Sequence, residues 1–231
     1  MAWGSAITEI MKMSIAQNAN PCAAWRIPTG VSVTAVLALW LSIVWALGTS
    51  GFLSAPVTQP FRPVLLSVIV PVVVFLAAFA GSTRFRKFMR SLDMRLLTMF
   101  QLWRVLGFGF LTLYAYDVLP GLFAWPSGLG DVAIGLTAPM VVWALMQQPD
   151  YAKSGRFIAF NLLGILDFIV AASTAVLASG AFPEIHTGLV TSAPMEIWPL
   201  NIFPGFIVPL FVFAHLTVLF QVRALRQQAI R

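Results

Sequence analysis

Three ionisable residues, Arg104, Asp167 and His215, lie within long apolar stretches of this sequence. A guanidinium, a carboxylate and an imidazole can pair with one another, hold a polar solute or exchange a proton, and histidine titrates near neutral pH. A charge at the centre of a bilayer costs at least about 2.5 to 3.5 kcal/mol, so it normally faces a partner or a water-filled cavity. These residues are therefore the first candidates for a site, with the amides Gln101 and Asn161 close to them in the sequence.

The apolar stretches that contain them have the length and composition of membrane helices. Only 10% of the 231 residues are charged, against about 25% in an ordinary soluble domain. A helix that crosses the hydrocarbon core needs about 20 apolar residues. Runs without Asp, Glu, Lys or Arg cover residues 27–61, 63–83, 132–149, 168–183 and 197–222.

The sequence therefore predicts an all-α integral membrane protein built as a six-helix transmembrane bundle. Residues 1–29 are expected to form an N-terminal segment, with a short amphipathic helix on the membrane surface at residues 5–17. Residues 30–222 are expected to form the transmembrane domain and residues 223–231 a basic tail. The six spans are placed at about 30–48, 62–81, 96–119, 127–146, 157–178 and 200–222.

The basic residues predict the orientation of these spans. Six spans place both termini on one side of the membrane with nearly all of the 14 lysines and arginines. Only Arg62 falls on the other side, and Arg104 lies within the membrane. Because positive charges stay on the cytoplasmic side, both termini are expected to be cytoplasmic, in a bacterial inner (plasma) membrane. The basic residues flank spans and form no stripe on a soluble domain, so nucleic-acid binding is not expected.

Because an α-helix rises 1.5 Å per residue, the position of a residue within its span gives its depth in the membrane. Counted from the cytoplasmic ends of their spans, Arg104 lies roughly 12 Å deep, Asp167 roughly 15 Å and His215 roughly 10 Å. The three side chains are therefore expected to meet. Two interpretations stay open: a structural Arg–Asp pair that joins two helices, or a polar, proton-linked site.

A second group of residues is expected at the outer face. The segment 119–131 is rich in proline and glycine and also apolar, which predicts an irregular loop that dips into the membrane under cover of protein. Asp131 is expected at the start of the fourth helix, as a cap or beside an anion held by free amides. The group comprises Asp117, Asp131, Ser127 and Trp125.

The sequence does not favour an enzyme, a metal or a cofactor. Ser127 and His215 superficially resemble the catalytic pair of rhomboid proteases, but they differ in depth by roughly 15–22 Å, too far for a nucleophile and its base. The single cysteine excludes a cysteine-based zinc site, and one histidine within the membrane does not make a bis-histidine haem site. No phosphate-binding loop for ATP is present.

Several short motifs between about residues 100 and 220 resemble uncharacterised multi-pass bacterial inner-membrane proteins. They are Trp103-Arg104, Leu119-Pro120, Phe123-Ala124, Gly130-Asp131, Asn161-Leu-Leu-Gly164 with Asp167, and the proline-rich start of the sixth span. The resemblance implies no particular activity.

Three functions remain open from the sequence. The leading hypothesis is binding or transport of a small solute, linked to a proton, through Arg104, Asp167 and His215. The alternative is an accessory or assembly subunit of a larger membrane complex, and the third is a membrane enzyme acting on a lipid or quinone. The expected partners are accordingly the lipid bilayer, a small-molecule ligand, and either further copies of the chain or other membrane subunits.

Overall fold

The fold is known from a computed structural model, which describes residues 27–56, 59–185 and 187–228. Over these ranges the chain is helical and contains no strand, which confirms the predicted all-α, six-helix class. The predicted surface helix at residues 5–17 lies outside the described residues. Six helices are long and apolar enough to cross a membrane, at Ser32–Thr49, Val64–Gly81, Met94–Ala115, Gly121–Gln147, Gly155–Leu177 and Phe203–Gln227.

The contacts divide the chain into two units, residues 1–42 and 43–231. The described part of the first unit is the apolar beginning of helix α2 (Ile27–Thr49). The second unit holds the end of α2 and the remaining elements, which are α3 (Val64–Gly81), α4 (Thr83–Ser91), α5 (Met94–Phe100), η2 (Gln101–Gly107), α6 (Phe108–Ala115), α7 (Gly121–Gln147), η3 (Pro149–Lys153), α8 (Gly155–Leu177), η4 (Ala193–Glu196), η5 (Phe203–Ile207) and α9 (Val208–Gln228).

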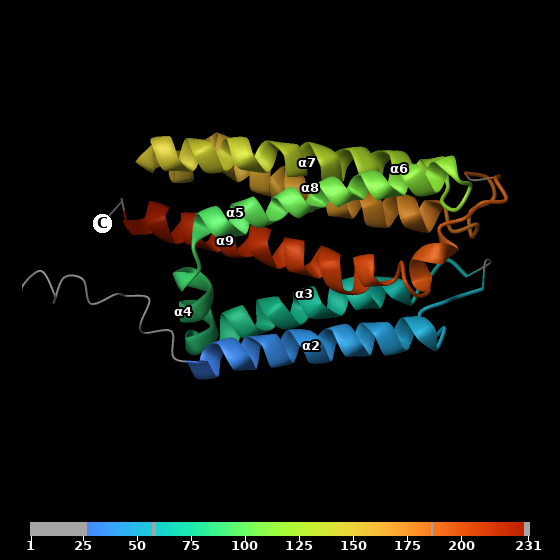
Figure 1. The fold of residues 1–231 in the computed structure, drawn as a ribbon, viewed down its shortest axis with the longest axis horizontal. Helices are drawn as coiled ribbons and strands as arrows, with labels where there is room; N and C mark the ends of the chain where they lie inside the picture. The colour runs from blue at the N-terminus through green and yellow to red at the C-terminus, as the bar shows by residue number, and fades with distance from the viewer. Residues whose placement is uncertain (1–26, 57–58, 186, 229–231) are drawn as a thin grey trace, which may run out of the picture. The chain divides into compact units, whose positions relative to one another are not determined.

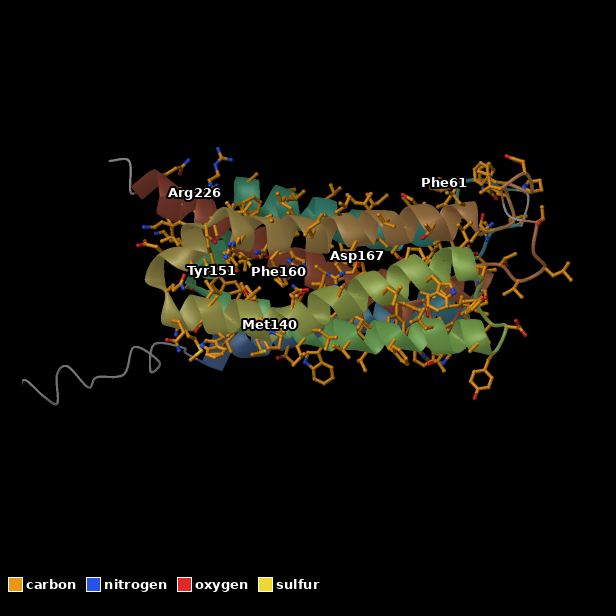
Figure 2. All side chains as sticks on the ribbon, turned by 90° about the horizontal axis from the view of Figure 1, so that it is seen from above. Phe61, Met140, Tyr151, Phe160, Asp167 and Arg226 are labelled. Carbon is orange, nitrogen blue, oxygen red and sulfur yellow. The ribbon has the colours of Figure 1, made fainter. Side chains whose placement is uncertain are left out.

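Helix α9 occupies the middle of the second unit. It contacts α3 on one side and α5 and α8 on the other, while α7 packs along α8 and against α5, η2 and α6 (Figure 1). Figure 2 shows Phe61 near one end of these helices, Tyr151 and Arg226 near the other, and Asp167 between them. Asp167, a candidate residue on α8, therefore lies well away from both ends of the bundle.

Two spans depart from the α-helix where they face this middle region. The third span changes to a 3₁₀-helix over η2, and the sixth begins with the π-helix η5. Pro204 and Pro209 lack the amide hydrogens that would continue the regular hydrogen-bond ladder there. Single-turn π segments and mid-helix 3₁₀ segments often mark functional sites.

The prediction of an irregular, membrane-dipping loop at residues 119–131 is wrong. Helix α7 begins at Gly121 and contains Pro126. Water does not reach the backbone in a bilayer, so backbone N–H and C=O groups must form their hydrogen bonds within the helix. For this reason a proline or glycine does not end a helix there as it does in water. Asp131 is therefore not a cap, but lies about 15 Å along the helix from its start.

Two segments expected outside the spans, a loop and the C-terminal tail, are also helical. Residues 82–95 contain α4, whose end is fixed by Gln221, since its Nε2 donates to the carbonyls of Met89 and Leu92 at 3.1 and 2.8 Å. Helix α9 continues to Gln228, so the described part of the predicted basic tail is an extension of the sixth span.

Glycines allow the helices around the middle region to approach closely. A Cβ atom built on Gly135 of α7 would lie 2.8 Å from the amide nitrogen of Val105. On α8, a Cβ atom on Gly164 would overlap the ring of His215. Small residues are the usual means by which membrane helices bring their backbones together, and here they bring four spans around one point.

At the opposite end from α4, a buried ion pair joins two loops. The Nε atom of Arg62 lies 2.6 Å from Oε1 of Glu196, and Oε2 of Glu196 accepts a hydrogen bond from the amide of Ala55 at 3.1 Å. Arg62 also donates to the carbonyl of Pro56 at 2.9 Å. The pair therefore connects the segment after α2 to the segment before α9.

Replacing Gly164 by alanine tests this close packing. The added methyl group overlaps the His215 ring, and overpacking of this kind costs about 1 to 3 kcal/mol. Gly155→Ala is the matched control on the same helix, because a Cβ atom there meets nothing within 4 Å. We expect Gly164→Ala to lower the thermal unfolding midpoint in detergent and Gly155→Ala to leave it nearly unchanged. Equal midpoints for the two variants would contradict the packing described.

Candidate functional site

Arg104 stands at the centre of a buried polar cluster in the middle of the second unit. It comes from η2, and its side chain is 0% exposed. Its Nε atom donates to Oδ1 of Asp131 at 2.7 Å, and Nη2 donates to Oδ2 of Asp167. Its Nη1 atom donates to the carbonyl oxygen of Gly164 at 3.1 Å. All three guanidinium nitrogens are thus engaged by α7 and α8.

His215 completes this shell of acceptors from α9. Its Nε2 atom lies 3.2 Å from Nη1 of Arg104, and its Nδ1 atom lies 3.0 Å from Oδ1 of Asn161. The amide nitrogen of Asn161 donates to the carbonyl of Phe157 at 2.9 Å, which assigns Oδ1 as the acceptor toward the ring. The proton therefore resides on Nδ1, and Nε2 offers its lone pair to Arg104.

The ring of Phe168 covers one face of the guanidinium. The Cζ atom of Arg104 lies 4.0 Å from the centre of this ring, a close cation–π contact. Arginine is suited to this position because its planar group donates in-plane hydrogen bonds to carboxylates while an aromatic ring stacks on its face.

The cluster contains two carboxylates, and the positive charge that pairs with them is the guanidinium group of Arg104. Among the residues that the structure describes, Arg104 alone makes an ion pair with Asp131 or Asp167. The side chains of the two acids are 15% and 11% exposed. With both acids ionised, the cluster would carry one unbalanced negative charge in a region of low dielectric constant.

Apolar clusters lie on either side of the charged residues along α7 and α8. Toward η3, the core includes Ala138, Phe157 and Val222. Toward the loop before α7, it includes Phe123 and Ala124. The polar cluster is therefore separated from each end of the bundle by packed side chains.

Two adjoining cavities open beside the cluster. The first has a volume of about 210 Å³ and is lined by residues of the third span, α8, η5 and α9, with Arg104 and Asp131 as its charged members. The second has a volume of about 90 Å³ and contains Ser127 and Asp131 in its wall. Phe168 borders both. Asp131 thus connects the ion cluster to both cavities.

The structure brings together Arg104, Asp167 and His215, as their depths predict, and places Asn161 in contact with His215. Gln101 is buried nearby, but its amide nitrogen donates to the carbonyl of Phe211 at 3.3 Å. It therefore supports the junction of η2 with α9 and makes no hydrogen bond to Arg104.

The predicted outer-face group does not assemble. Asp117 is exposed at the end of the third span, with a positive φ of 55°, and Trp125 packs edge-on against Tyr114 at 5.8 Å. Ser127 and Asp131 instead face the second cavity. Sequence reasoning separated Asp131 from Arg104 because it started the fourth helix six residues too late.

Comparison with known proteins defines the family. Residues 61–223 match the profile of a family described as a domain of unknown function, DUF8737. The match covers more than half of the chain, and the chain belongs to this family. No curated protein and no solved structure matches it. The class is thus a multi-pass membrane protein with a buried charged cluster, and the matched region contains all the residues of that cluster.

The charge arrangement makes the arginine far less replaceable than either acid. Arg104→Gln leaves two buried carboxylates without their cation, and removing one partner of a buried ion pair costs about 3 to 5 kcal/mol. Asp131→Asn leaves a balanced Arg104–Asp167 pair, so we expect a loss of about 1 kcal/mol, typical of one hydrogen bond. Unfolding midpoints of the purified variants measure the difference. A larger loss for Asp131→Asn than for Arg104→Gln would contradict this account.

Proposed function

We propose that this protein binds a small solute in the middle of the membrane, at the cluster of Arg104, Asp131, Asp167 and His215, and that binding is linked to a proton. One observation carries the proposal: a single buried guanidinium is hydrogen-bonded to two carboxylates. An uncompensated charge in such a place costs several kcal/mol. The second carboxylate therefore needs a cation, and the smallest is a proton.

The hydrogen bonds divide the roles among the residues. Arg104 is held on three sides and acts as a fixed positive charge. Both ring nitrogens of His215 are engaged, so in this arrangement it positions the guanidinium and the two acids share the exchangeable proton. Asp131 also borders the cavities, which makes it the acid that contacts a solute.

Linkage between proton and solute follows from that shared carboxylate. A solute that donates a hydrogen bond to Asp131 changes the free energy of protonating the pair. By reciprocity, protonation changes the affinity for the solute by the same factor. Intramembrane carboxylates, histidines and arginines serve in this way in proton relays and transporters, and we extend the proposal to transport of the solute across the membrane.

The proposed location is a bacterial inner membrane with both termini in the cytoplasm. The support is that the basic residues of α4, of η3 and of the end of α9 lie at one end of the bundle, among them Arg86, Lys153 and Arg226. Positive charge marks the cytoplasmic side. The opposite end carries the buried pair of Arg62 with Glu196.

Cysteine labelling in intact cells checks this orientation. In a Cys22→Ser background, we expect Thr191→Cys to react with a membrane-impermeant maleimide and Lys87→Cys to react only after the cells are opened. The reverse pattern would place the basic end outside.

Infrared difference spectroscopy tests the shared proton directly, because a protonated carboxyl group and a carboxylate absorb at different frequencies. We expect the purified protein at neutral pH to show one protonated, shielded carboxyl group. Both Asp131→Asn and Asp167→Asn should remove this band, since the remaining carboxylate is then balanced by Arg104. Asp117→Asn is the matched control, because Asp117 is exposed, and it should keep the band.

Two outcomes would overturn the proposal. Absence of the band from the unaltered protein would mean that no proton is shared. If a protein with Arg104→Asp and Asp167→Arg folds as the unaltered protein does and shows the same proton-driven uptake in liposomes, the pair serves only to join the helices.

Native mass spectrometry of protein extracted gently from its membrane then separates a self-contained protein from a subunit of a complex, which would carry unrelated chains in fixed stoichiometry.

A further inference from the structure

The cavities beside the cluster have walls suited to an aromatic molecule. Apart from Arg104 and Asp131, the first cavity is lined by uncharged residues, and six of its wall residues are aromatic: Phe100, Trp103, Phe110, Phe168, Phe203 and Phe211. Aromatic rings prefer edge-to-face and offset contacts with one another. A flat ring is therefore the best match to these walls.

The size of the space agrees with a single ring. An apolar cavity of about 150 Å³ in another protein holds a benzene molecule. The first cavity, at about 210 Å³, accommodates a ring with a few substituent atoms. The second, at about 90 Å³, adds room for one polar substituent.

A polar end is provided by two residues on one face of α7. Ser127 and Asp131 are four positions apart in the sequence, so their side chains lie next to each other on the helix. Both border the second cavity. The hydroxyl of Ser127 is buried and has no hydrogen-bond partner among the described residues. Asp131 uses Oδ1 for Arg104, which leaves Oδ2 as an acceptor.

The space is reached from the lipid side of the bundle. Trp103 and Leu106 border the first cavity and are 64% and 61% exposed on the surface of the third span. A molecule dissolved in the bilayer can therefore reach the cavity between the third span and α9. Packed apolar clusters lie between the cavity and both ends of the bundle, so this route is shorter than one from water.

We infer that the cavities bind an uncharged aromatic alcohol, a phenol or the ring of a quinol, that enters from the bilayer. Its hydroxyl group donates to Asp131 and accepts a hydrogen bond from Ser127, while the ring lies among the aromatic walls. This inference rests on the proposed function for the choice of site, because Asp131 belongs to both. A tail on the ring would leave between the third span and α9, by the route described above.

Thermal unfolding of the purified chain in detergent tests the inference with three probes. They are para-propylphenol, para-propylanisole, which has the same body but no hydroxyl donor, and a hydroquinone with a decyl tail. At a concentration about ten times its dissociation constant, a ligand raises the midpoint of a protein of this size by about 3 to 6 °C. We expect this rise with para-propylphenol and less than half of it with para-propylanisole.

Two substitutions connect the effect to the cavities. Val208 borders both cavities, so Val208→Phe fills them and should abolish the rise, whereas Leu166→Phe on the exposed face of α8 should keep it. Ser127→Ala removes only an unpartnered hydroxyl, so it should fold normally and weaken para-propylphenol binding about three- to tenfold, as expected for one hydrogen bond. This variant keeps the test valid if Val208→Phe does not fold.

The outcomes separate this inference from the proposed function. Equal rises with the phenol and the anisole, or a full rise in folded Val208→Phe, would overturn the ligand assignment while the infrared band of the shared proton stays intact. Loss of that band from the unaltered protein would overturn the proton proposal instead. A rise with the tailed hydroquinone well above that with para-propylphenol identifies a membrane quinol as the source of the ring, and the reverse order identifies a free phenol.

Discussion

Everything in the middle of this protein is arranged around a guanidinium group that cannot reach water. Arg104 carries a full charge at a depth where an isolated charge is not tolerated, so three other spans supply acceptors to it: Asp131 from α7, Asp167 from α8 and His215 from α9. The ion cluster therefore specifies which helices meet and at what height. The hydrophobic effect cannot do this between membrane helices, because lipid chains are as apolar as the side chains they would replace. Polar contacts of this kind give the bundle a register that its many interchangeable valines and leucines do not.

The charged cluster also requires the backbones of its helices to approach closely. An arginine reaches three partners at once only if the helices that carry them are near, and Gly135 and Gly164 lie at points where a methyl group would collide with the neighbouring element. The 3₁₀ segment that carries Arg104 and the π segment that begins the sixth span adjust the same region. Irregular backbone is tolerated at membrane depth where protein covers it or where it lines a cavity. Here both conditions hold, since these segments also form the walls of the first cavity.

The sequence was sufficient to predict the six spans and the meeting of Arg104, Asp167 and His215, because apolar length and helix rise are properties of single helices. It was not sufficient to include Asp131. Pro126 and the surrounding glycines indicate a loop by rules learned in water, whereas in the bilayer the helix continues from Gly121. A helix that starts at Gly121 places Asp131 about 15 Å from that end, near the middle of a hydrocarbon core of about 30 Å and thus close to Asp167. The cavities were beyond prediction, since they depend on how side chains from several helices fail to fill a common space.

The buried pair of Arg62 with Glu196 has a consequence for how the protein is made. The two residues are separated by 134 positions, so the contact forms only after synthesis has passed Glu196, shortly before the sixth span is made. Until then this ion pair cannot join the segment after α2 to the segment before α9. Closure of this end is thus a late event in biogenesis, and it coincides with the arrival of His215, the last member of the charged cluster. A chain cut short before Glu196 would lack both contacts at once, which distinguishes it from a copy that contains the sixth span.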